Sequence, residues 1–93
     1  MRKIIDPFTD YLPHLDLHGE TTATIVYLIE AFIRDNVKLK NDKIIIIHGK
    51  GSGALRSKTH ELLKRNKRVN KYYIDGLNDG QTVVLLNLKY NWK

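Results

Sequence analysis

One continuous stretch, residues 44–56, constrains the fold of this 93-residue chain more than any other. It begins with four consecutive isoleucines, which are typical of a strand that is buried on both faces. Three glycines then fall between positions 49 and 53, and their spacing predicts a tight loop that leads into a helix. A strand that passes through a glycine-rich loop into a helix can hold a phosphate, because the helix N-terminus offers free N–H groups and a partial positive charge.

A second, shorter strand is predicted over residues 15–19. Apolar and polar residues alternate there with a period of two, so Leu15 and Leu17 are expected to face the core. Asp16 and His18 share the opposite face, close to the end of the strand. The glycine that follows them lets the chain turn.

Periodicity and turn-forming residues predict the other elements. The first helix is capped by Thr21 or Thr22 and carries a stripe of apolar residues at helical spacing. A turn of about six residues, rich in glycine, asparagine and aspartate, precedes the last strand. The expected order is strand, helix, strand, helix, strand, strand, over residues 15–19, 21–35, 43–48, 54–66, 69–75 and 82–88.

This β-α-β-α-β-β order predicts an α/β fold of the α+β two-layer sandwich type, with a four-stranded mixed sheet and both helices on one face. The first two connections are expected to be right-handed parallel crossovers, and the last two strands to pair antiparallel. The second and fourth strands are apolar on both faces, so something must cover the face without helices. The alternatives are an N-terminal arm (residues 1–13), a C-terminal tail (residues 89–93) and a second subunit, around a domain that spans residues 14–88.

Charge and composition indicate a polyanionic partner. The chain carries a net charge of +6, and its basic residues are concentrated between positions 50 and 71, where Glu61 is the single acid. Such a cluster is often only a solvated face, but its position beside the glycine loop favours a nucleic-acid backbone. The chain has no cysteine, no apolar run near the ~18 residues of a membrane span and no signal-peptide pattern, so we expect a cytoplasmic protein with no membrane partner.

Side chains suited to phosphodiester chemistry lie at the ends of the first two strands. Ligands of open α/β sheets bind beyond the carboxyl ends of parallel strands, and neighbouring strands lie ~5 Å apart. If these two strands are neighbours, Asp16, His18, His48 and Lys50 meet there. An imidazole transfers protons near neutral pH, a carboxylate fixes its tautomer or binds a metal ion, and a lysine stabilises negative charge. The structural alternative is that each histidine is merely hydrogen-bonded and that Asp16 hydrogen-bonds the following turn.

Other ligand sites fit the sequence less well. Residues 49–54 match a Gly-x-Gly-x-x-Ala dinucleotide pattern, with Asp75 further on, but the pattern lies on the second strand and the chain is too short for two mononucleotide-binding halves. A Walker loop would need a Gly-Lys-Ser/Thr that is absent. The four histidines are too scattered for a zinc site, and His14 and His60 are interpreted as structural or surface residues.

Two motifs in this order resemble the Smr (small MutS-related) domain family. They are Leu-Asp-Leu-His-Gly at residues 15–19 and His-Gly-Lys-Gly at residues 48–51, separated by one helix. The resemblance covers about residues 14–88 and implies the two-layer sandwich also seen in the C-terminal domain of a bacterial translation initiation factor. Smr domains occur at the C-terminus of MutS2 proteins and as standalone proteins. Because no MutS ATPase precedes the motifs and Met1 looks like a natural start, the chain resembles the standalone bacterial type.

The resemblance implies nucleic-acid binding and, as in several members, endonuclease activity on DNA or RNA, in DNA repair or recombination or in the rescue of stalled ribosomes. It assigns Asp16 and His18 as the catalytic pair. Mg²⁺ or Mn²⁺, if either takes part, is expected on Asp16, since hard cations prefer carboxylate oxygen. Arg56, His60 and Lys64 recur every four residues and are expected to form an exposed row on the second helix. The expected phosphate-binding residues, including Arg56 and Lys64 from this row, are His48, Gly49, Lys50, Gly51, Ser52, Gly53, Arg56, Lys58 and Lys64.

A non-catalytic module that binds nucleic acid or the ribosome is the alternative function. The sequence leaves open whether the partner is DNA or RNA and whether the chain is a monomer or a homodimer.

Overall fold

The computed structural model describes residues 11–51 and 53–89 of the chain. Within these ranges the predicted order of four strands and two helices is confirmed. The elements are β1 (His14–Asp16), α1 (Ile25–Lys38), β2 (Lys43–Ile47), α2 (Ala54–Arg65), β3 (Val69–Asp75) and β4 (Asn78–Leu86).

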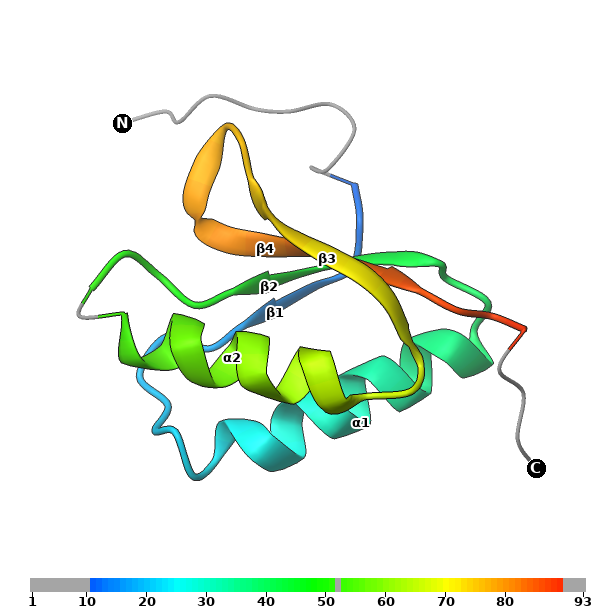
Figure 1. Ribbon diagram of the computed structural model, residues 1–93, viewed down its shortest axis with the longest axis horizontal. Coiled ribbons are helices and arrows are strands. Elements are labelled where there is room, and N and C mark those ends of the chain that lie inside the picture. The colour runs from blue at the N-terminus through cyan, green and yellow to red at the C-terminus, as the bar shows by residue number, and fades with distance from the viewer. Residues whose placement is uncertain (1–10, 52, 90–93) are drawn as a thin grey trace.

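The strands form one mixed sheet in the order β1-β2-β4-β3. β1 pairs parallel with β2, and Asp16 lies opposite Ile47 at the end of the pairing. β4 lies between β2 and β3 and runs antiparallel to both. Both helices lie on the same face of this sheet (Figure 1). The arrangement is the predicted two-layer sandwich, and it brings the end of β1 beside the end of β2.

The main core lies between the helices and the sheet. Ile29 and Ile33 on α1 pack with Ile44 and Ile46 on β2, and these side chains are at most 1% exposed. Leu17 is fully buried in the same cluster, as its period-two pattern predicted. Each such aliphatic side chain contributes about 1.5–3 kcal/mol through burial, so the sheet and helices are held together mainly by this layer.

The opposite face of the sheet is also closed at its centre. Ile45 and Val83 pair across β2 and β4, and their side chains alternate with those that reach the helices. They are 0% and 1% exposed in the single chain, so the chain itself buries this part of the face. Most of the predicted N-terminal arm (residues 1–10) and of the predicted tail (residues 90–93) lies outside the described residues.

The hairpin between β3 and β4 is tighter than the sequence predicted. β4 begins at Asn78 instead of residue 82, so Gly76 and Leu77 alone separate the two strands. The Asp75 carboxylate explains this turn, because it accepts the backbone N–H of Leu77 at 2.9 Å and the side-chain amide of Gln81 at 2.7 Å. A segment dense in turn-forming residues therefore contains one short turn and the first residues of a long strand.

The ends of α1 also differ from expectation. The predicted cap at Thr21 or Thr22 is wrong: the N-cap residue is Thr24, and its side chain makes no capping hydrogen bond to the helix. Thr21 lies in the turn before the helix and forms a reciprocal pair with Thr24, in which each hydroxyl accepts the backbone N–H of the other, at 3.2 and 3.0 Å. The helix continues to Lys38, past the predicted exit at residue 36. Asn36 does not end it, because its side-chain amide donates to the carbonyl of Phe32 at 2.8 Å. No described helix is long and apolar enough to cross a membrane.

Candidate functional site

The carboxyl ends of β1 and β2 open into a groove of about 450 Å³. The backbone N–H of Leu17 donates to the carbonyl of Ile47 at 2.9 Å, which extends the parallel pairing to the edge of the groove. The two sequence motifs therefore meet, as the parallel strands predicted. The residues that line the groove are Asp16, His18, Gly19, Ile47, His48, Gly49, Lys50, Gly51 and Leu55.

Of the other expected site residues that the structure describes, none belongs to this lining. Arg56 is half-buried in the first turn of α2, and Lys64 is exposed further along that helix. Lys58 is paired with Glu61 at 3.5 Å, and the same carboxylate also pairs with Arg65 at 3.4 Å. Two basic residues of α2, Lys58 and Arg65, are thus partly neutralised by an acid of the same helix. Ser52 lies outside the described residues.

Asp16 holds the turn that carries His18. Its Oδ1 accepts the backbone N–H of His18 at 2.9 Å, so the predicted alternative, a hydrogen bond to the following turn, is confirmed. Both side chains are exposed, and among the described residues no hydrogen bond joins the Asp16 carboxylate to the His18 ring. The imidazole of His18 therefore faces the groove with both nitrogens open to a ligand.

The glycine loop is anchored to β4. The backbone N–H groups of His48 and Gly49 both donate to the carbonyl of Gly80, at 3.0 and 2.8 Å. The N–H of Gly49, expected to bind phosphate, is therefore already used. By contrast, the N–H groups of Lys50, Gly51 and Gly53 make no hydrogen bond within the ranges that the structure describes. The loop thus offers three backbone donors just before α2 begins.

Asp79 and Gly80 are site residues that the sequence analysis missed, because it placed them in a turn. Lys50 Nζ lies 3.4 Å from Asp79 Oδ1, and since both side chains are about two-thirds exposed this ion pair is weak. A Cβ added to Gly80 would lie 3.2 Å from Cγ of Lys50 and 3.5 Å from the carbonyl carbon of Gly49. The first residues of β4 therefore pack against the glycine loop, and they leave little room for a side chain at position 80.

A polar network lies beneath the loop. His48 is 6% exposed, and its Nε2 lies 2.8 Å from Oγ1 of Thr82, a fully buried residue of β4. Nε2 of His60 lies 2.8 Å from the same oxygen. The His60 ring also packs against His48 and Tyr72, with ring centroids 5.9 and 5.1 Å away. His60 is therefore structural, as one alternative held, and its predicted place in an exposed row of α2 is wrong.

Burial lowers the pKa of both imidazoles below the usual value of about 6.5. For His48 desolvation is the main cause, and the charge of Arg56 adds to it, while the Gly49 carbonyl and Asp79 oppose it. For His60 desolvation again comes first, followed by repulsion from the protonated form of His48 and from Arg56, both of which also lower the pKa. Both rings are therefore neutral at pH 7.

These shifts predict that the protein loses stability in mild acid. The unfolded chain binds protons at the two histidines near pH 6.5, whereas the folded chain binds them only at lower pH. Their contribution is therefore complete above about pH 6.5 and decreases as the pH falls toward the folded pKa values. Urea unfolding from pH 7.5 to 5 should show the decrease, and His60→Gln should make it shallower. His14→Gln, which changes an exposed histidine, is the control, and equal slopes in both variants would contradict the prediction.

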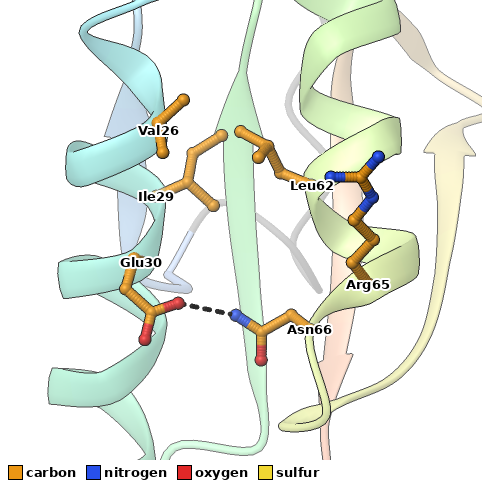
Figure 2. Close-up of a pocket in the computed structure, with 6 residues that line it drawn as sticks. All are labelled: Val26, Ile29, Glu30, Leu62, Arg65 and Asn66. Atoms are coloured by element: carbon orange, nitrogen blue, oxygen red, sulfur yellow. Dashed lines mark hydrogen bonds between the residues drawn. The ribbon is translucent and has the colours of Figure 1, made fainter.

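A second hollow of about 230 Å³ lies between α1 and α2 (Figure 2). Val26, Ile29 and Leu62 give it an apolar lining. At its lower end Glu30 accepts a hydrogen bond from the side-chain amide of Asn66 at 3.0 Å. The lining also includes Arg65, whose guanidinium pairs with Glu61 at 3.4 Å. A largely apolar hollow that carries a carboxylate, and whose cation is already paired, does not suit a phosphate, so the groove at β1 and β2 is the candidate site.

Among the described residues that line the groove, Asp16 is the one with a carboxylate. Within residues 11–51 and 53–89, no group of three or more His, Asp or Glu side chains is placed to hold a metal ion. Mg²⁺ is commonly bound through one or two carboxylates together with substrate phosphates, and it keeps several waters. Asp16 therefore fits such an ion only when a phosphate in the groove supplies further ligands.

Comparison with known sequences identifies relatives over most of the chain. The family model of the Smr domain matches residues 15–87. Endonuclease MutS2 of Geobacillus sp. (strain WCH70) is 37% identical over 76 residues, and Endonuclease MutS2 of Finegoldia magna is 38% identical over 72. The matches cover 81% and 77% of this chain but 10% and 9% of those proteins, so the chain spans about a tenth of their length.

Two solved structures share the fold. The crystal structure of the Smr domain of Thermus thermophilus MutS2 has a TM-score of 0.79 and 32% identity, and the match covers 82% of this chain and 99% of that one. YdaL, a stand-alone small MutS-related protein from Escherichia coli, has a TM-score of 0.73 and 23% identity, over 78% of this chain and 63% of that one. The first match covers almost all of an isolated domain, and the second shows the shared fold.

Proposed function

We propose that this chain, which belongs to the Smr domain family, binds nucleic acid through its glycine loop and cleaves a phosphodiester bond in the adjoining groove. The groove carries the proposal. Its lining includes the exposed imidazole of His18, which follows β1, and Lys50 and Gly51 of the loop after β2, whose backbone N–H groups are unused in the described part of the chain. The MutS2 relatives are named endonucleases, which supports the same chemistry.

The loop is suited to hold the phosphate. The N–H groups of Lys50, Gly51 and Gly53 lie immediately before α2, where the helix dipole adds a partial positive charge. The Lys50 ammonium is exposed at the groove, and its weak pair with Asp79 is readily exchanged for a phosphate oxygen. Arg56 adds a second cation one turn into the helix. These groups neutralise the phosphate and the charge that develops on it during attack.

His18 is the proposed proton-transfer residue. It is exposed, and its ring has no hydrogen-bond partner in the described part of the chain, so it is free to take a proton from the nucleophile or give one to the leaving oxygen. Asp16 keeps His18 in place through the backbone. His48, in contrast, is buried and both its ring nitrogens are engaged, so we assign it to the support of the loop rather than to proton transfer.

A non-catalytic binding module is the second candidate. One observation favours it: the Asp16 carboxylate contacts the backbone of His18 and not its ring, so the imidazole lacks the partner that commonly fixes a catalytic tautomer. In this case the groove would bind a phosphate without turnover.

Cleavage assays of the unmodified protein test the proposal. Labelled supercoiled DNA and structured RNA are each incubated with Mg²⁺, Mn²⁺ or EDTA. We expect one substrate to be cut, and its identity then distinguishes a role in DNA repair or recombination from one on stalled ribosomes. Retention of cleavage in EDTA would exclude a required metal ion on Asp16. Tight binding without cleavage in every condition would contradict the enzyme and favour the binding module.

A further inference from the structure

We propose that Thr82 and His60 are positioning residues of the nucleic-acid site, which fix the tautomer of His48 and, through it, the direction of a backbone donor in the glycine loop. The consequence for binding rests on the proposed function. The order of the hydrogen bonds is a property of the free protein and is tested separately.

The contact with the carbonyl of Gly49 identifies which nitrogen of His48 carries the hydrogen. His48 Nδ1 lies 3.1 Å from this oxygen, and because a carbonyl only accepts, Nδ1 carries the hydrogen. A neutral imidazole has one N–H group, so Nε2 of His48 is an acceptor. The buried position of the ring and the nearby charge of Arg56 keep it neutral.

Thr82 connects His48 to His60 on α2, so the direction of its hydrogen bonds follows from the tautomer of His48. Its hydroxyl has one hydrogen, and its oxygen lies 2.8 Å from Nε2 of both His48 and His60. Because Nε2 of His48 accepts, the hydroxyl donates to it and must itself accept from His60. His60 is therefore the Nε2–H tautomer. One directed series of hydrogen bonds runs from α2, through β4, to the loop.

The last bond of the series orients the loop. The carbonyl of Gly49 and the N–H of Lys50 belong to one planar trans peptide and point in opposite directions. Holding the carbonyl against His48 therefore aims the Lys50 N–H, one of the unused donors, away from the network. In the other tautomer, Nδ1 would present a lone pair to the carbonyl oxygen, and the peptide would rotate away.

Two matched pairs of variants test the order of the bonds. Thr82→Val removes the hydroxyl and keeps the shape, whereas Thr82→Ser keeps the hydroxyl. His60→Leu removes the donor, whereas His60→Gln places an amide N–H near the same position. The second pair changes His60, which is half-buried, so these variants still test the order of the bonds if Thr82→Val does not fold.

Nitrogen NMR of the imidazoles gives the first readout, on the free protein. We expect a Nδ1–H tautomer at His48 and a Nε2–H tautomer at His60. Thr82→Val and His60→Leu should give a mixture at His48 and move the Lys50 amide resonance, and Thr82→Ser and His60→Gln should restore both signals. A Nε2–H tautomer at His48, or a Lys50 amide that moves in none of the variants, would overturn the inference whether or not the protein binds nucleic acid.

Affinity for a labelled DNA duplex and a labelled structured RNA gives the second readout. We expect Thr82→Val to weaken binding about tenfold, which corresponds to one hydrogen bond to a charged group, and Thr82→Ser to restore it. Unchanged affinity in Thr82→Val would overturn the positioning role and leave the proposed function standing. If the unmodified protein binds neither probe, the proposed function fails, and the NMR signals alone decide the inference.

Discussion

Replacement of His18 by alanine is expected to lower cleavage at least ~100-fold, the usual contribution of a general acid or base, while binding of the uncut nucleic acid stays nearly unchanged. The reason is structural. The His18 side chain is exposed and carries no other hydrogen bond within the described ranges, and its backbone N–H still reaches Asp16 in the variant. Initial rates and affinity on the substrate that the unmodified protein cuts provide the measurement.

His14→Ala is the matched control, because His14 is an exposed histidine at the start of the same strand and outside the groove lining. Its cleavage rate should equal that of the unmodified protein. A His18→Ala variant that loses affinity in parallel with cleavage would argue that His18 binds the substrate instead of transferring a proton.

Asp16→Asn separates two roles of the carboxylate. The asparagine oxygen can still accept the backbone N–H of His18, but the negative charge is gone. Retained cleavage would show that Asp16 only holds the turn. Loss of cleavage, most severe at low Mg²⁺ or Mn²⁺ concentration, would show that the charge itself takes part.

The double variant Lys50→Ala/Arg56→Ala is expected to weaken nucleic-acid binding about tenfold or more and to reduce its salt dependence. Each phosphate contact contributes roughly −0.9 to the slope of log K against log salt on duplex DNA, so the slope should become shallower by about 1.8. Lys50 lines the groove, and Arg56 lies close enough to His48 and His60 to lower the pKa of both. Fluorescence anisotropy at several salt concentrations measures both quantities.

Lys38→Ala/Lys89→Ala removes the same charge at the opposite end of the molecule. Lys38 ends α1 just before β2 begins, and Lys89 follows the end of β4, whereas the groove lies where β2 ends and β4 begins. Equal losses of affinity and slope in the two double variants would indicate that net charge alone attracts the nucleic acid and that the loop has no special part.

The sequence was sufficient to predict the order of the elements and the two-layer arrangement, whereas the meeting of the two motifs was predicted only on the condition that the first two strands are neighbours. Period-two alternation placed Leu17 in the core, and strands joined by a helix predicted that β1 and β2 run parallel; the structure shows that they also pair. Once that pairing is known, Asp16 and His18 must lie beside the residues that follow β2. These inferences depend on local periodicity and chain connectivity, both of which are visible in a single sequence.

The contacts of α2 and β4 that hold the glycine loop could not be predicted in the same way. Helical spacing placed His60 with Arg56 and Lys64, but His60 lies where α2 meets β4 and finds a buried hydroxyl there. A polar side chain can be removed from solvent when a second polar side chain accepts or donates its hydrogen bond. Such a pair cannot be predicted from the spacing of apolar residues. The early start of β4 was missed for a related reason: the carboxylate of Asp75 completes a two-residue turn that composition alone had suggested was longer.

The position of β4 determines when the groove can form during protein synthesis. β4 leaves the ribosome after the other three strands that the structure describes, yet it inserts between β2 and β3, and its first residues supply the carbonyl and the hydroxyl that hold the glycine loop. A nascent chain that ends before residue 78 contains both sequence motifs but lacks Gly80 and Thr82. A nuclease built in this way would become competent only after β4 has been synthesised, so chains released from the ribosome before that point would carry no organised cutting site.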